Sequence, residues 1–168
     1  MIRKATPNDK VELENFLKRW NALLVARRGV LELSLNHPAL IAESQGKIVG
    51  ASTYIVRRRE CEVLTLHIDD KWKGTGSALI AAVKETARDL RCKRLWLITT
   101  NDNVDALRFY QRRGFRLAVL HREAVNDSRA RLKPEIPLVG RYMIPLRDEL
   151  ELECEISEVH DADDEGRT

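Results

Sequence analysis

The chain has 168 residues, of which 43% are apolar and 33% are charged, proportions typical of a soluble globular protein with a single core. The longest apolar runs, at 22–26 and 78–83, are far shorter than the roughly 18 residues that a membrane-spanning helix needs. Residues 1–7 also lack the apolar stretch of a secretory signal. We therefore expect no membrane association and a cytoplasmic location.

The net charge of +3 conceals an uneven distribution. Nine acidic residues and one arginine lie from Glu149 onward, which leaves 28 basic and 17 acidic residues before that point. A basic body favours an anionic ligand, either a nucleotide-like cofactor or nucleic acid, and charge alone does not decide between them. We expect one domain over residues 1–154, followed by an acidic, disordered tail over 155–168.

The three cysteines, Cys61, Cys92 and Cys154, are odd in number and far apart, and no histidine lies at ligand spacing from them. A disulfide framework or a zinc site would need paired or closely spaced ligands. We therefore expect reduced, buried thiols and no metal site.

The first elements in chain order are one helix and three strands. Thr6 and Asp9 mark a helix start, as N-cap and as the acid three residues after it, with a proline between them. Apolar residues recur at helical spacing as far as Leu24, so one amphipathic helix is predicted, with Gly29 as its stop. Strands are predicted at 40–43, 48–56 and 61–68, and they should pair as antiparallel neighbours.

The second half of the chain alternates helices and strands. Helices are predicted at 76–90, 103–113 and 127–133, and strands at 95–100, 115–120 and 149–154. The strand, helix, strand order predicts that the strands at 61–68 and 95–100 run parallel. The fold class is therefore α/β, with a mixed sheet that carries helices.

A glycine turn precedes the helix at 76–90, with the sequence Lys73-Gly74-Thr75-Gly76-Ser77-Ala78. Convergent N–H groups at a helix N-terminus, together with glycines that allow close approach, predict a site for a phosphate group. The spacing does not fit a Walker loop, G-x-x-x-x-G-K-[ST]. It also departs from the dinucleotide pattern G-x-G-x-x-G, because Leu79 stands at the place of the third glycine.

A second motif follows at a suitable distance, Asn103-x-x-Ala106-x-x-Phe109-Tyr110-x-x-x-Gly114-Phe115. The turn resembles the pyrophosphate turn of the GNAT superfamily of N-acetyltransferases, with Lys73 in place of the usual Gln or Arg, and the second motif resembles the family's next one. Two motifs in this order make the chain similar to GNAT proteins from its first helix to its last strand.

The resemblance implies a mostly antiparallel, twisted sheet with helices on both faces and two central parallel strands that splay apart around acetyl-CoA. It implies that the backbone of Leu66, His67 and Ile68 pairs with the pantetheine arm of this cosubstrate. The N–H groups of residues 73–78 would receive the pyrophosphate. Asn103 would bond the arm, a role compatible with a plain helix cap.

The resemblance also implies direct acetyl transfer to a primary amine. None of the three cysteines lies in either motif, so we expect no acetyl-cysteine intermediate. Tyr110 matches the tyrosine near the cofactor sulfur and would protonate the leaving thiolate, although a ring that only packs beside Phe109 is the alternative. Glu62 stands where some members carry a carboxylate base. The alternatives are a solvated acid beside the arginines at 57–59, a water chain, or a histidine, His67 or His121. A backbone N–H near His67 or Ile68 would meet the oxyanion.

The resemblance leaves the acceptor open, as a small-molecule or peptide amine selected by residues 13–28 and 132–146. A non-catalytic acyl-CoA sensor or assembly domain is the alternative function for the same fold. A nucleic-acid binder is disfavoured, because arginine runs such as 57–59 and 112–113 are usually solvated faces. A homodimer is compatible with the resemblance.

Overall fold

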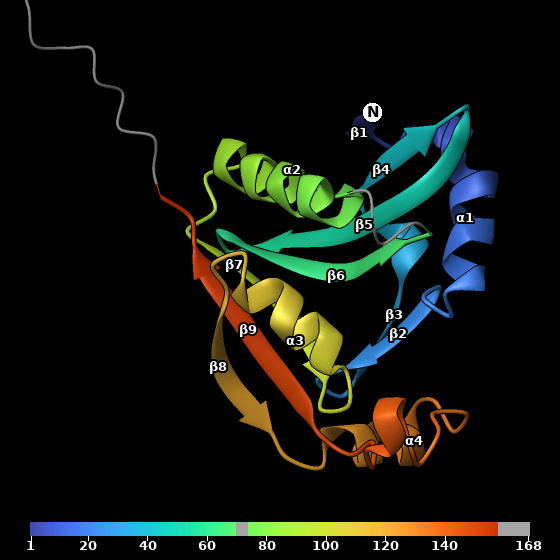
Figure 1. Ribbon diagram of the computed structural model, residues 1–168, viewed down its shortest axis with the longest axis vertical. Coiled ribbons are helices and arrows are strands. Elements are labelled where there is room, and N and C mark those ends of the chain that lie inside the picture. Colours follow the sequence, from blue (N-terminus) through green and yellow to red (C-terminus); the bar gives the residue numbers. More distant parts are fainter. Residues whose placement is uncertain (70–73, 158–168) are drawn as a thin grey trace, which may run out of the picture.

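The computed structural model describes residues 1–69 and 74–157. In these residues the main sheet has seven strands in the order β1-β4-β5-β6-β7-β9-β8, and β2 and β3 form a separate hairpin (Figure 1). The strands are β1 (Ile2–Lys4), β2 (Leu24–Arg27), β3 (Val30–Leu33), β4 (Ala39–Ser44), β5 (Lys47–Arg57), β6 (Glu60–Ile68), β7 (Arg94–Thr100), β8 (Arg116–His121) and β9 (Glu149–Glu155). The α-helices are α1 (Lys10–Arg19), α2 (Thr75–Asp89), α3 (Val104–Gln111) and α4 (Ala124–Arg131).

The described strand pairs are antiparallel except for β6 and β7. These two parallel strands are connected through α2, because parallel neighbours require a crossover. Their pairing stops at Val63 and Leu97, although β6 continues to Ile68 and β7 to Thr100. The predicted mixed sheet with two splayed central parallel strands is confirmed.

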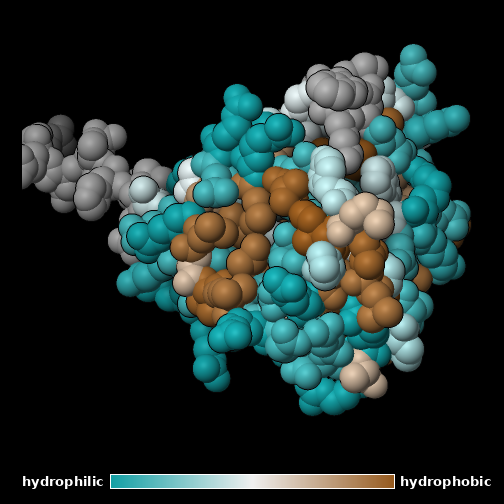
Figure 2. All heavy atoms as spheres, turned by 60° about the horizontal axis from the view of Figure 1, so that its bottom comes forward, coloured by the Kyte–Doolittle hydropathy of each residue, from teal (hydrophilic) through white to brown (hydrophobic). Residues whose placement is uncertain are grey.

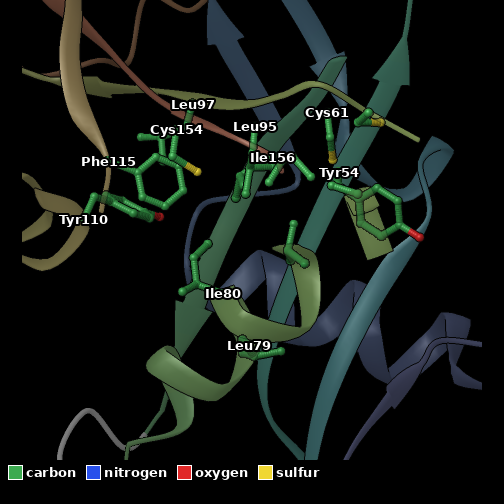
Figure 3. Close-up of a cluster of buried hydrophobic side chains, with 14 of the residues drawn as sticks. Tyr54, Cys61, Leu79, Ile80, Leu95, Leu97, Tyr110, Phe115, Cys154 and Ile156 are labelled. Carbon is green, nitrogen blue, oxygen red and sulfur yellow. The ribbon is translucent and has the colours of Figure 1, made fainter. Parts of the chain in front are cut away.

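Helices cover both faces of the sheet, as predicted. On one face, α2 and α3 pack against the strands in the larger core, and Figure 3 shows Ile80 of α2 and Tyr110 of α3 among the side chains of this core. On the other face, Phe16 of α1 belongs to a second core that includes residues of β4 and β5. Neighbouring residues of β4 point to opposite faces and so join different cores.

The single opening helix that we predicted as far as Gly29 is wrong in its second half. The start is confirmed, since the Asp9 carboxylate accepts hydrogen bonds from the backbone and hydroxyl of Thr6. The helix ends at Arg19, because Asn21 takes a positive φ of 51° that α-helical backbone does not allow. Residues 24–33 then form the hairpin β2–β3, and Gly29 lies in its two-residue turn.

The hairpin turn explains why apolar spacing was misleading in this stretch. Arg28 and Gly29 have φ values of 49° and 74°, as a two-residue turn that matches the twist of the strands requires. The strands around it are stabilised by tertiary contacts, which periodicity along the chain does not reveal. The three-residue edge strand β1 was also missed.

The other predicted elements are confirmed within a few residues. The largest displacement is that of α4, which begins three residues before the predicted helix at 127–133. Its hydrogen bonds explain the shift, since the N–H groups of Val125 and Asn126 both donate to the carbonyl of Arg147.

Four of the acids counted from Glu149 onward belong to β9 rather than to a tail. Glu151 and Glu153 accept short hydrogen bonds from Arg94, both at 2.5 Å, and Arg116 also pairs with Glu153. The folded chain continues past the expected boundary at residue 154, because Ile156 is buried and its N–H donates to Lys93. The expected disordered tail, from residue 158 onward, lies outside the described residues.

One edge of the main sheet is the strand β8. Its apolar side chains Leu117, Val119 and Leu120 are about half exposed, and Leu138 and Met143 are exposed further along the chain. Figure 2 brings the lower end of Figure 1 forward and shows apolar side chains gathered across this face among hydrophilic ones. The homodimer stays a prediction.

Candidate active site

The gap between β6 and β7 contains a cavity of about 140 Å³. The pattern of hydrogen bonds across β5 and β6 determines which backbone groups face it. The N–H of Asp69 donates to the carbonyl of Val49 on β5. Because every second residue of an antiparallel strand bonds to the same neighbour, the N–H and C=O groups of His67 also point to β5. The N–H and C=O groups of Leu66 and Ile68 then point to the opposite edge, which β7 does not pair. The cavity is lined by residues 63–67 and 97–99 together with Asn103, Ala106 and Tyr110.

The first turn of α2 presents backbone donors. Gly74 is the N-cap and has a left-handed conformation with φ of 71°, which glycine adopts at little cost. The first helical hydrogen bond runs from the N–H of Ala78 to the carbonyl of Gly74. The N–H groups of Thr75, Gly76 and Ser77 therefore precede that bond and remain available to an anion. Of the predicted turn, Lys73 lies outside the described residues.

Gly76 lies closely packed against β6 and α3. A Cβ atom at this position would lie 2.5 Å from Cδ1 of Ile68 and 3.2 Å from Cε2 of Phe109. The missing side chain thus brings the helix against β6 and α3, so that the turn, the strand edge and the second motif meet in one place.

Arg113 is a basic residue beside the turn that our site prediction did not include. Its guanidinium donates through Nε and Nη2 to Ser77 Oγ, at 3.0 and 2.5 Å, and lies 3.6 Å from the centre of the Phe109 ring. Burial lowers the pKa of Arg113, and so does the neighbouring Arg112. The position of Arg113, one helical turn after Phe109, could have indicated this contact. We instead interpreted the arginines at 112–113 as a solvent-exposed surface.

Tyr110 lines the cavity and is only 7% exposed. Its ring makes edge contacts with Phe109 and Phe115, with centroids 5.1 and 5.3 Å apart, and Figure 3 shows it beside Phe115. Burial raises the pKa of the Tyr110 phenol, so the hydroxyl keeps its proton at neutral pH. The packing role that we weighed as an alternative is therefore present, and it is compatible with a donor role.

Asn103 is the N-cap of α3, as predicted. Its Oδ1 accepts from the N–H of Ala106 at 3.3 Å and also from Arg141, while its Nδ2 donates to Thr99 Oγ1 at 3.1 Å. The residue lines the cavity, so a further contact to the cosubstrate arm stays a prediction.

Glu62 is buried, with 5% of its surface exposed, and both carboxylate oxygens accept hydrogen bonds of 2.7 Å from Arg27. The alternative of a solvated acid beside the arginines at 57–59 is therefore wrong. Arg27 was missed because residue 27 lay in the expected helix, whereas β2 carries its side chain to β6. Whether Glu62 takes a proton in the reaction stays a prediction.

The two histidines are engaged elsewhere. His67 stacks on Trp20, with ring centroids 5.3 Å apart, and the Nε2 of His121 lies 2.9 Å from Glu151. His121 does not line either cavity described here, and His67 lines only the one that contains Tyr110.

A second cavity, of about 200 Å³, adjoins the first. The two share Val63, Leu64, Ile98 and Thr99, the residues at the point where β6 and β7 separate. The second cavity is completed by residues 25–27 of the hairpin, Glu62, Thr100 and Glu149. Glu149 was predicted only as the first residue of the last strand, and an alternating run of Glu and Leu gave no sign of its burial.

The three cysteines are buried and free, as predicted, and burial raises the pKa of the Cys61 thiol to about 12. Within residues 1–69 and 74–157, no group of three or more His, Cys, Asp and Glu side chains is arranged to hold a metal ion. None of the helices in the same ranges is both long and apolar enough to cross a membrane.

Comparison with known proteins agrees with this arrangement. The profile of the acetyltransferase (GNAT) family matches residues 8–115. YdhI and YxbD, two uncharacterized proteins of Bacillus subtilis, are 42% identical over 137 residues and 39% identical over 142 residues. These alignments cover 80% and 84% of this chain, and 84% and 89% of the two relatives.

Solved structures share the fold at lower identity. A Bacillus subtilis acetyltransferase in complex with CoA has a TM-score of 0.68 at 15% identity, with 93% of this chain and 98% of that chain covered. A GNAT acetyltransferase of Elizabethkingia anophelis with acetyl-CoA bound has a TM-score of 0.66 at 18% identity, with 92% and 97% covered. The family match over most of the chain shows that this protein belongs to the GNAT family of acetyltransferases, enzymes for which acetyl-CoA is the cosubstrate.

Proposed function

We propose that the protein transfers an acetyl group from acetyl-CoA to a primary amine by direct attack within a ternary complex. The observation that carries the proposal is the gap between β6 and β7. Around this single gap lie an unpaired strand edge, the free N–H groups of α2 and the buried ring of Tyr110.

The residues of the chain fit the cosubstrate at the unpaired strand edge, at the start of α2 and at Arg113. The backbone of Leu66 and Ile68 offers hydrogen bonds to an extended amide-bearing arm, as an additional strand would. The N–H groups of residues 75–77 and the guanidinium of Arg113 favour a pyrophosphate through the helix dipole and charge. Acetyl-CoA supplies the acetyl group as a thioester, whose carbonyl carbon is the electrophile.

Tyr110 is the proton donor of the proposal. Expulsion of a thiolate leaves a charge that a nearby phenol neutralises, and the Tyr110 hydroxyl is held protonated by burial. No cysteine lines either cavity, so the described site offers no thiol for a covalent acetyl intermediate. The amine therefore attacks the thioester itself, and both substrates are bound together.

The acceptor approaches through the second cavity. This cavity meets the first where β6 and β7 separate, and residues 25–27 of the hairpin form part of its wall. A small-molecule amine or a peptide N-terminus is the proposed acceptor class. A cytoplasmic location, a single domain that extends to Ile156 and a homodimer complete the proposal, and sedimentation of the purified protein tests the last.

Calorimetric titration with acetyl-CoA tests the cosubstrate site. Ala78→Glu adds a carboxylate at an exposed position in the first turn of α2, where negative charge favours the helix but repels a pyrophosphate. We expect affinity to fall about tenfold or more, equivalent to about 1.4 kcal/mol, with no loss of thermal stability. Ala78→Gln has a similar size without the charge and should bind almost as the wild type does. Equal binding by both variants would place the anion elsewhere.

Turnover with a panel of primary amines tests the reaction. Tyr110→Phe should lower kcat about a hundredfold or more while acetyl-CoA affinity is kept. Tyr54→Phe is the matched control, because Tyr54 is also buried but lines neither cavity. A wild type that binds acetyl-CoA and acetylates no amine of the panel would favour the sensor alternative.

A further inference from the structure

The second cavity contains three charged side chains that differ in how well they are paired. Arg27 and Glu62 neutralise each other through two hydrogen bonds of 2.7 Å. The remaining nitrogen of the Arg27 guanidinium, Nη1, lies 3.7 Å from a carboxylate oxygen of Glu32. Every nitrogen of this guanidinium therefore has a carboxylate partner. Glu149 is the third charged residue, and it is only 1% exposed.

Glu149 has no ion pair in the described part of the chain. Its two carboxylate oxygens accept from a single donor, the backbone N–H of Arg28, at 3.0 and 3.3 Å. Burial raises the pKa of Glu149, and the hydrogen bond from Arg28 and the neighbouring cations oppose this effect only in part. The titratable groups that face it are Arg27 on β2, Arg28 in the hairpin turn, Glu62 on β6 and His121 on β8, while the facing stretch of β7, residues 98–100, has none.

We propose, resting on the function proposed above, that Glu149 binds the acceptor as an ammonium ion and takes its proton before attack. Glu62 and Arg27 are positioning residues in this scheme, because their mutual hydrogen bonds hold β2 over the cavity. The carboxylate that can still exchange a proton is the one that lacks a cationic partner, and it shares a cavity with the point where β6 and β7 separate.

The Glu149 carboxylate accepts one proton from the ammonium group and later passes it to solvent. The freed lone pair of nitrogen forms the C–N bond with the thioester carbonyl carbon, and the C–S bonding pair leaves on sulfur. Tyr110 gives its proton to that sulfur and is restored by the second proton that leaves nitrogen. The products are the amide, the free thiol and one proton.

The charges of this cavity also define the acceptor. A negatively charged group near the amine would meet two buried carboxylates, and the single cation in the lining is already paired with one of them. Burying an unpaired charge costs several kcal/mol, so anionic acceptors are excluded. The acceptor is therefore a primary amine that has no carboxylate close to the nitrogen.

The pH dependence of kcat/KM for Glu149→Gln tests the base. If Glu149 accepts the proton from the ammonium ion, kcat/KM does not change with pH as long as the pH lies between the pKa of this carboxyl and the pKa of the amine. Without the base, only the minor neutral amine reacts, so kcat/KM should rise tenfold per pH unit towards an amine pKa of about 10. We expect the variant to be at least about a hundredfold slower at pH 7 and to approach the wild type near pH 9 to 10.

Controls separate a chemical role from a structural one. Glutamine can still accept the hydrogen bond of Arg28, so the variant should keep the acetyl-CoA affinity and the melting temperature of the wild type. Glu155→Gln changes an exposed carboxylate on the same strand, outside both cavities, and should leave the pH profile unchanged. A Glu149→Gln enzyme with the rate and level profile of the wild type would overturn the assignment.

A matched pair of acceptors tests the substrate class. Propylamine and β-alanine have amines of similar basicity, but only the second has a carboxylate two carbons from the nitrogen. We expect propylamine to have at least a tenfold higher kcat/KM, and equal values would overturn the acceptor class. If the wild type acetylates neither these nor a diamine, an amino acid amide or a peptide, the proposed function itself fails, whatever the Glu149 variant does.

Discussion

The buried pair of Arg27 and Glu62 gives the most direct test of how the hairpin is fixed to the sheet. Both side chains are more than nine-tenths buried, and two hydrogen bonds of 2.7 Å join them. Arg27→Met keeps a long aliphatic side chain and removes the cation, which leaves the Glu62 carboxylate buried without a partner. Breaking a buried pair on one side typically costs about 3–5 kcal/mol, because the remaining charge cannot return to water.

Urea unfolding measures this cost as the free energy of unfolding in water. For a protein of this size, about 3–5 kcal/mol corresponds to a fall in Tm of roughly 6–20 °C. The double variant Arg27→Met, Glu62→Met should recover most of the loss, since replacing both charges by apolar groups is often neutral or stabilising. Arg19→Met is the control, because the ion pair of Arg19 with Asp69 is largely exposed and should contribute less than about 1 kcal/mol.

Two results would refute this reasoning. A loss below about 1 kcal/mol for Arg27→Met would mean that water reaches the pair and that the hairpin is not fixed by it. A double variant as unstable as the single one would mean that shape, rather than the uncompensated charge, determines the cost.

Two further predictions concern the turn and the acidic strand. Gly76→Ala should destabilise the fold by about 1–3 kcal/mol, because its Cβ would lie 2.5 Å from Ile68, and an unfolding curve that matches the wild type would contradict the close approach. Hydrogen bonding to Arg94 lowers the pKa of Glu153, so the stability that this carboxylate adds is present above about pH 4.5 and is lost as pH falls below that value. Arg94→Met should reduce that acid-side loss, measured by urea unfolding between pH 3 and 6, and an unchanged slope would mean that other carboxylates dominate.

The elements around the cosubstrate could be predicted from sequence because their signals are local. The turn at 73–78 and the motif from Asn103 to Phe115 specify a helix N-terminus, a cap and a buried aromatic within a few residues. The parallel pairing of β6 and β7 follows from the order of elements alone. Local sequence signals are therefore enough to predict the elements of the proposed cosubstrate site.

The acceptor side could not be predicted in the same way. Arg27 and Glu62 are 35 residues apart, and Arg28 and Glu149 are 121 apart, so only the tertiary fold brings these groups together. Apolar spacing favoured a helix across residues 20–28, while the left-handed Asn21 and the turn at Arg28 and Gly29 turned the chain back as a hairpin. A buried acid in an alternating strand, such as Glu149, has the same local sequence pattern as a solvated one.

The wall of the acceptor cavity is formed in part by a hairpin that pairs with no strand of the main sheet. The hairpin therefore need not keep a hydrogen-bond register with the strands β4 to β9. The hairpin also makes none of the contacts that we assign to the acetyl donor. Acceptor preference and donor recognition can diverge independently in such an arrangement. Grafting residues 21–34 between related enzymes should transfer the choice of amine while the affinity for acetyl-CoA stays the same, so this segment is the natural target for altering specificity by design.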